Sequence, residues 1–162
     1  MIKDYREISV TGRKELFKLE KFIEEICDYH NINNEYFGNI LLASTESANI
    51  LILVAGEEQA SKLIISFEKT VKGFTFKLKF SGKNVFNDKD HILEQEIRKH
   101  RLTKEIYIVK ALADEVTISV KGESITLTFY VSSINYEKSL LRISQLKDYW
   151  IKKTSIVKKG NE

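Results

Sequence analysis

A carboxylate and an amide lie within a largely apolar stretch of this chain, at Glu46 and Asn49. The surrounding residues 44–56, STESANILILVAG, have the composition of a buried helix that ends at Gly56. Because a buried, unpaired carboxylate is costly, Glu46 must be paired, protonated or in contact with a wet cavity. In such a cavity the carboxylate could act as a general base.

Helical spacing places both residues on one stripe with three others. Five side chains follow one another at intervals of three or four residues: Asn39, Leu42, Glu46, Asn49 and Leu53. Residues at this spacing share one helix face. One interpretation is a partly exposed polar face, or a hydrogen bond between neighbouring side chains. The other is that the stripe forms the floor of a ligand pocket, in which Glu46 is an active or vestigial general base.

The segments that must position this stripe have clear helical or strand periodicity, and the chain contains no proline. We expect strands at 5–10, 62–69, 74–80, 115–120 and 124–131, and helices at 13–29, 33–54, 88–102, 103–114 and 135–153. The strand residues expected to face the core are Phe74, Phe76, Leu78 and Phe80, then Ile125, Leu127, Phe129 and Val131. Hairpin turns are expected at Lys72-Gly73 and Lys121-Gly122. This order predicts an α+β two-layer sandwich, with a mostly antiparallel, mixed sheet covered by helices.

The bulk composition favours one folded, soluble domain. Of the 162 residues, 43% are hydrophobic and 30% are charged, which is ordinary for a globular protein. A lone cysteine, Cys27, cannot form an internal disulfide, and this fits a reducing cytosol. The sequence MIKDYREISV is too polar for a signal peptide, and the longest apolar run, 50–55, is far shorter than the ~20 residues that span a bilayer. We therefore expect a cytoplasmic protein.

Two stretches resemble a known family. Residues 34–56, NEYFGNILLASTESANILILVAG, resemble the ATP-binding helix of the anti-sigma-factor serine kinases, which belong to the GHKL (histidine kinase-like ATPase, Bergerat fold) superfamily. Residues 106–129, IYIVKALADEVTISVKGESITLTF, are similar to the family's closing helix and two strands. The resemblance covers 1–132 and leaves 133–162 as a C-terminal amphipathic helix and basic tail. It implies that Glu46 stands at the family's general base, and that Asn39, Glu46 and Asn49 belong to a remnant nucleotide pocket.

The resemblance fails at the metal-binding position. The family's Mg²⁺-binding Asn lies four residues after the Glu, where this chain has Ile50. Asn49 is one residue early, which rotates its side chain by about 100° around the helix and away from that ion. Mg²⁺ takes oxygen ligands, and an isoleucine offers none. We expect no metal site.

Two further family elements differ as well. Phe80 or Ser81 stands where the family has the Asp that accepts the adenine amino group. Thr103 and Glu105 replace the lid glycines, and a carboxylate beside phosphates is unfavourable. The lid segment 87–102 is charged and helical in character, whereas lids that open and close are usually loops. These departures predict a pseudo-ATPase.

Two functions therefore compete. The first is a regulatory protein-binding module that resembles an anti-sigma factor, acts in signal transduction and transcription regulation, and has a degenerate ATP site without catalysis. Its expected partner is a sigma factor or an anti-anti-sigma-like regulator, with a homodimer also open and no cofactor. The alternative is an active ATP- and Mg-dependent protein serine kinase with Glu46 as base. The protein-binding function is favoured by the residues at three family positions, Ile50, Phe80 and Glu105.

The remaining polar clusters have simpler interpretations. Three histidines, His30, His91 and His100, lack the spacing of a metal site, and we expect them to be solvated or to cap helices. The basic run 97–104, IRKHRLTK, is diluted by flanking glutamates, so we read it as a solvated helix face and do not expect nucleic acid as a partner.

The C-terminal helix carries an apolar stripe that needs a partner surface. Its members are Leu140, Ile143, Leu146 and Trp150. They could pack on the protein's own sheet or form an interface with a partner or a second copy.

Overall fold

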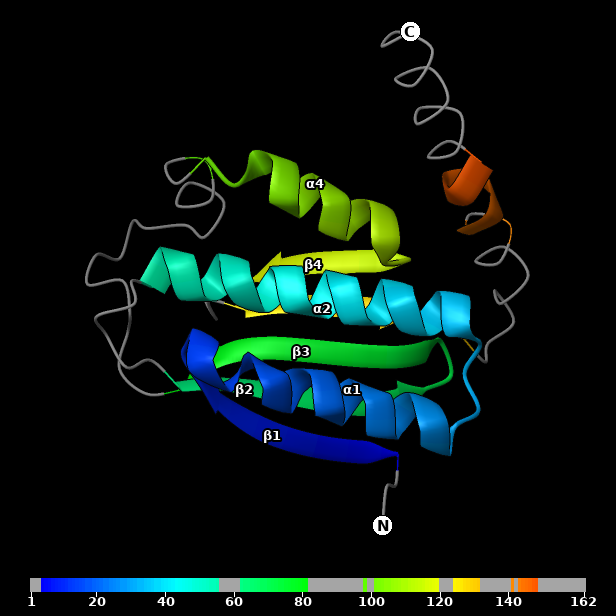
Figure 1. The fold of residues 1–162 in the computed structure, drawn as a ribbon, viewed down its shortest axis with the longest axis horizontal. Helices are drawn as coiled ribbons and strands as arrows, with labels where there is room; N and C mark the ends of the chain where they lie inside the picture. Colours follow the sequence, from blue (N-terminus) through cyan, green and yellow to red (C-terminus); the bar gives the residue numbers. More distant parts are fainter. Residues whose placement is uncertain are drawn as a thin grey trace, which may run out of the picture.

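The protein is an α+β two-layer sandwich in which helices cover one face of a five-stranded sheet (Figure 1). The structure, a computed structural model, describes residues 4–55, 62–81, 98, 101–119, 124–131, 141 and 143–148. Helix α2 lies between α1 and α4 over the sheet. In chain order the elements are β1 (Tyr5–Thr11), the 3-10 turn η1 (Arg13–Glu15), α1 (Leu16–Tyr29), α2 (Asn34–Ala55), β2 (Lys62–Thr70), β3 (Gly73–Ser81), α4 (Thr103–Leu112), β4 (Glu115–Ser119) and β5 (Ser124–Phe129).

The strands pair in the order β1-β2-β3-β5-β4, and every one of these pairs is antiparallel. One row across the sheet runs through Ile8, Ile65, Leu78, Ile125 and Ile118. The predicted α+β class is thus confirmed, and the described elements follow the predicted order. The described strands form no parallel pair, so the sheet is antiparallel rather than mixed.

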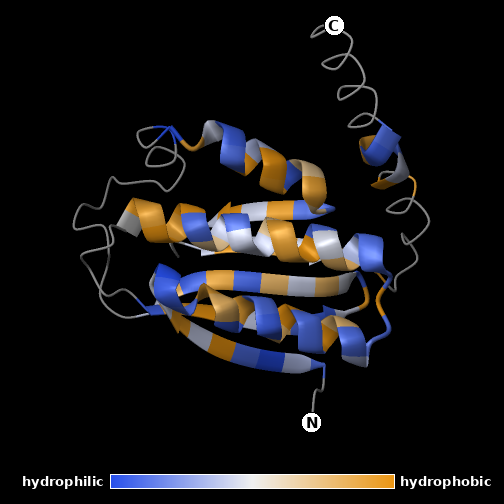
Figure 2. Ribbon diagram, in the orientation of Figure 1, coloured by the Kyte–Doolittle hydropathy of each residue, from blue (hydrophilic) through white to orange (hydrophobic). Residues whose placement is uncertain are grey.

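Alternate strand residues face the helices and form the core. The predicted inward residues are all buried: Phe74, Phe76, Leu78, Phe80, Ile125, Leu127, Phe129 and Val131. Figure 2 shows the same alternation of apolar and polar residues along the strands. Phe67 of β2 joins them, with its ring centroid 5.0 Å from that of Phe74 and 5.3 Å from that of Phe76. Each buried ring stabilises the fold by roughly 1.5–3 kcal/mol, so this aromatic cluster ties the sheet to the helices.

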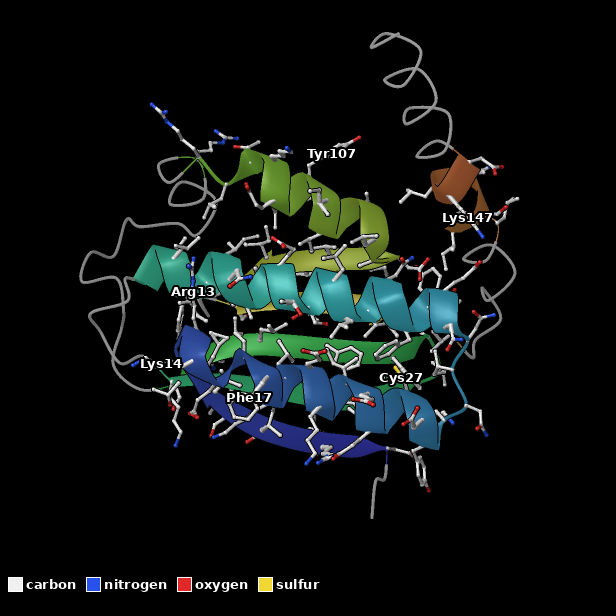
Figure 3. The ribbon with its side chains drawn as sticks, viewed as in Figure 1. Arg13, Lys14, Phe17, Cys27, Tyr107 and Lys147 are labelled. Atoms are coloured by element: carbon white, nitrogen blue, oxygen red, sulfur yellow. The ribbon has the colours of Figure 1, made fainter. Side chains whose placement is uncertain are left out.

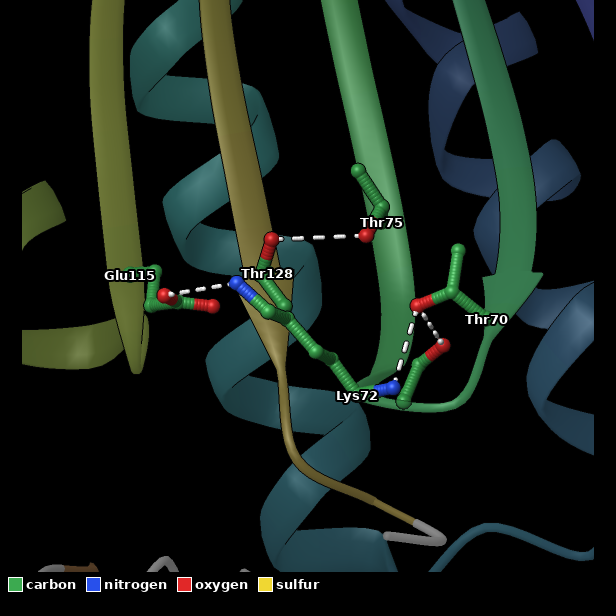
Figure 4. Close-up of polar contacts among 6 residues, drawn as sticks. Thr70, Lys72, Thr75, Glu115 and Thr128 are labelled. Carbon is green, nitrogen blue, oxygen red and sulfur yellow. Dashed lines mark hydrogen bonds and ion pairs between the residues drawn. The ribbon is translucent and has the colours of Figure 1, made fainter.

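The predicted turn between β2 and β3 is present, although β3 begins already at Gly73. The backbone N–H of Lys72 donates to Thr70 Oγ1 over 3.2 Å, and Lys72 Nζ lies 3.4 Å from Glu115 Oε1 (Figure 4). Gly73 has a φ of +132°, and a Cβ there would lie 2.1 Å from the backbone oxygen of Phe129. Glycine is therefore required at this close approach.

Helices α1 and α2 begin close to their predicted positions. The predicted apolar residues of α1 are buried at Leu19, Ile23 and Ile26. Asn33 caps α2, because its Oδ1 accepts the N–H of Glu35 over 2.8 Å. The predicted closing residue, Gly56, lies outside the described residues.

Helix α2 is long and apolar enough, over Asn34–Val54, to cross a membrane by length and composition alone. Half of that stretch is buried, and α2 contacts α1, α4 and the sheet. A core helix of a soluble protein has these same properties. The structure is therefore consistent with a soluble protein.

Only part of the C-terminal segment 133–162 belongs to the described residues. Leu141 and residues 143–148 are helical, as predicted. Ile143 is buried, Leu146 packs against the core, and Lys147 Nζ lies 3.3 Å from Glu35 Oε1 at the start of α2. This part of the apolar stripe thus packs inside the chain. Three predictions lie outside the described residues. They are the contacts of Leu140 and Trp150, the turn Lys121-Gly122, and the helix 88–102, of which only 98, 101 and 102 are described.

Candidate functional site

A cavity of about 320 Å³ lies where the C-terminal half of α2 meets η1 and the start of α4. Its lining residues come from three elements and the residue before α4: Arg13, Glu46, Asn49, Ile50, Leu53, Leu102 and Glu105. Figure 3 shows Arg13 beside the C-terminal half of α2. This cavity contains two of the three predicted site residues, Glu46 and Asn49.

The predicted stripe on α2 divides into two parts. Glu46, Asn49 and Leu53 line the cavity, and the two polar side chains are half-buried. Asn39 is also half-buried but does not line the cavity, and Leu42 is 46% exposed. The polar residues of the stripe are thus partly wet, which removes the problem of a carboxylate in a dry core.

Asn49 and Ile50 both line the cavity. The predicted direction of Asn49 relative to a Mg²⁺ ion stays a prediction. The cavity extends far enough around α2 to contact two consecutive side chains. Ile50 is only 1% exposed and presents hydrocarbon where the resemblance would place a Mg²⁺ ligand. Asn49 supplies an amide to the same cavity.

Glu105 brings a second carboxylate to this cavity from the first turn of α4. Its Oε2 atom is enclosed and has no hydrogen-bond partner within the part of the chain that the structure describes. An enclosed oxygen without a hydrogen-bond partner lowers the stability of the fold. A carboxylate near a helix N-terminus interacts favourably with the helix dipole, which offsets part of that loss. Thr103, the other residue that replaces a lid glycine, is exposed.

The end of β3 contributes nothing to the Glu46 cavity. Phe80 is a core residue at 7% exposure, and Ser81 ends the strand opposite Lys62. Both line a separate cavity of about 410 Å³, which also contacts Lys77 and Lys79. Among the described residues, no group of three or more His, Cys, Asp or Glu side chains is placed to hold a metal ion.

His30 is the C-cap residue of α1, and its side chain packs among aromatic rings, so it is not the solvated histidine that the sequence left open. Its ring centroid lies 4.9 Å from Phe74, 5.0 Å from Tyr29 and 5.9 Å from Phe67. Its Nε2 is enclosed and has no hydrogen-bond partner among the described residues. Burial lowers the pKa of His30, and the charge of Lys69 lowers that pKa further, while Asp4 opposes the shift. His30 is therefore a neutral part of the core edge.

Two aromatic side chains are the most exposed ones of the described helices. Phe17 of α1 is 63% exposed and Tyr107 of α4 is 73% exposed (Figure 3). Phe17 lies among exposed lysines at helical spacing, Lys14 and Lys21. Aromatic residues are enriched in protein interfaces.

No protein-family model matches this chain, and no curated protein matches its sequence. The GHKL resemblance therefore stays a prediction that rests on the two quoted stretches. Arguments about function depend on the residues of the cavity and of the exposed surface.

Proposed function

We propose that this chain is a regulatory protein-binding module, a cytoplasmic relative of the anti-sigma-factor serine kinases whose nucleotide cavity no longer supports ATP turnover. The observation that carries this proposal is the composition of one cavity. Ile50 and Glu105 line it together with Glu46, the position of the family's general base by resemblance. A working site would need groups that these two residues cannot supply.

The chemistry of phosphate binding supports this proposal. ATP with Mg²⁺ needs oxygen ligands for the ion and N–H donors or cations for the phosphates. Glu46 and Asn49 add oxygens to the cavity, but Ile50 presents an aliphatic group at the position of the family's Mg²⁺ ligand. The carboxylate of Glu105 also repels phosphate oxygens. Of the described lining residues, Arg13 is the one that adds a positive charge.

An exposed surface on α1 supports binding to a protein. Lys14, Phe17 and Lys21 recur at intervals of three and four residues, and all three are exposed. A partner with an acidic patch would bury Phe17 and pair with the lysines. By resemblance, that partner is a sigma factor or an anti-anti-sigma-like regulator.

The experiment is a thermal-unfolding titration with ATP and with ADP, each with and without Mg²⁺. A ligand at about 100 times its Kd stabilises a native protein by roughly 2.7 kcal/mol, so binding would be visible. We expect no shift of the melting temperature at millimolar nucleotide. A Mg²⁺-dependent shift would refute the proposal and favour the active serine kinase, with Glu46 as base and Asn49 beside the ion.

A further inference from the structure

Among the described residues, the cavity beside Glu46 has more negative than positive side chains on its walls. Two carboxylates, Glu46 and Glu105, and one guanidinium, Arg13, line this described part of the cavity. Glu105 Oε2 is enclosed without a hydrogen-bond partner in the described part of the chain. Since an enclosed carboxylate oxygen is costly unless a cation or an N–H donor pairs with it, these walls favour a positively charged ligand.

The other walls are apolar and restrict the shape of that ligand. Leu53 and Ile50 come from α2, and Leu102 comes from the residue before α4. Asn49 adds an amide oxygen, which can accept a hydrogen bond from an ammonium group. A volume of about 320 Å³ lies at the lower end of the range for small-molecule sites. A short aliphatic chain that ends in a cation matches both kinds of wall.

We infer that this cavity binds an alkylammonium group. The ammonium lies among Glu46, Asn49 and Glu105, and the aliphatic chain packs on Leu53 and Leu102. The inference rests on the proposed function, because a cavity that held ATP would exclude this ligand. The ligand is either a free primary amine or a lysine side chain of the protein partner, since both present the same chemical group.

The first test is titration of the full chain with n-pentylammonium chloride, followed by NMR of the backbone amides in α2 and α4. The matched probe is 1-pentanol, which has the same chain and no charge. We expect saturable shifts at millimolar pentylammonium and binding of pentanol at least about tenfold weaker, because hydrogen bonds to charged groups are the strong ones. Equal binding of the two probes, or no saturable binding of pentylammonium, would overturn the inference.

Variants of the cavity identify which groups hold the ammonium. Glu46→Gln and Glu105→Gln keep the side-chain shape and remove one charge each, so each should weaken pentylammonium binding about tenfold. Asn49→Asp adds a charge at the same place and should strengthen it. Glu24→Gln, on the exposed face of α1, is the control and should change nothing. Wild-type affinity in both glutamine variants, or no gain with Asn49→Asp, would contradict the inference.

Two further probes separate the possible sources and the two proposals. Nα-acetyl-lysine methylamide should bind more tightly than pentylammonium if the natural ligand is a partner's lysine, and more weakly if it is a free amine. A titration with ATP and Mg²⁺ is run in parallel and tests the proposed function. A nucleotide shift overturns the proposed function whatever pentylammonium does. Failure of pentylammonium to bind, with no nucleotide effect, overturns this inference alone.

Discussion

Replacing Glu105 by methionine should stabilise the protein, although the residue lies in the first turn of a helix. The substitution removes the enclosed Oε2, which has no hydrogen-bond partner among the described residues. An unsatisfied buried polar atom costs about 1–3 kcal/mol, and more when it is charged. The lost interaction between a first-turn carboxylate and the helix dipole is smaller, about 0.3–1 kcal/mol. The net gain should be about 1 kcal/mol.

A gain of that size is measurable by thermal unfolding. In a chain of 162 residues, 1 kcal/mol raises the melting temperature by roughly 2–4 °C. Glu20→Met, an exposed position on α1, is the control and should shift it by much less. A fall in the melting temperature of Glu105→Met, with the control unchanged, would refute the reasoning. It would mean that the Glu105 carboxylate is paired.

Three further predictions concern the stability of the fold. Gly73→Ala should unfold at markedly lower denaturant, because φ is +132° and the new Cβ would lie 2.1 Å from the oxygen of Phe129; an unchanged midpoint would contradict this. Asn33→Ala should cost about 1 kcal/mol in a urea titration by removing the cap of α2, whereas Asn33→Asp should cost little. The pKa of His30 is lowered in the folded state, so the unfolded chain binds the extra proton; stability should fall as pH drops below about 6.5, and His30→Phe should flatten that slope. An equal slope in the variant would count against a neutral His30.

Much of the fold was predictable from local patterns in the sequence. Alternating apolar residues predicted the inward face of β3, and the spacing of Leu19, Ile23 and Ile26 predicted the buried face of α1. The sequence offered Asn33 or Asn34 as the cap of α2, and the structure has Asn33. These features depend on neighbours in sequence, which is why one sequence suffices to find them.

The site was only half predictable, because it joins distant segments. Glu46 and Asn49 share one helix face, and their spacing placed them together. Arg13 and Leu102 reach the same cavity only through the packing of η1 and α4 against α2, which no local pattern encodes. The rotation argument for Asn49 concerns its direction relative to a Mg²⁺ ion and stays a prediction. The packing of His30 could not be predicted, since two of its aromatic neighbours, Phe67 and Phe74, come from strands that follow it in sequence.

The central claim is that the cavity beside Glu46 does not bind ATP with Mg²⁺. Calorimetric titration of the full chain with Mg·ATP tests it most directly, with Mg·ADP as a second ligand. The account predicts no saturable heat at millimolar nucleotide, which corresponds to a binding free energy weaker than about −4.1 kcal/mol. A saturable, Mg²⁺-dependent heat that Glu46→Gln or Asn49→Ala abolishes would contradict it.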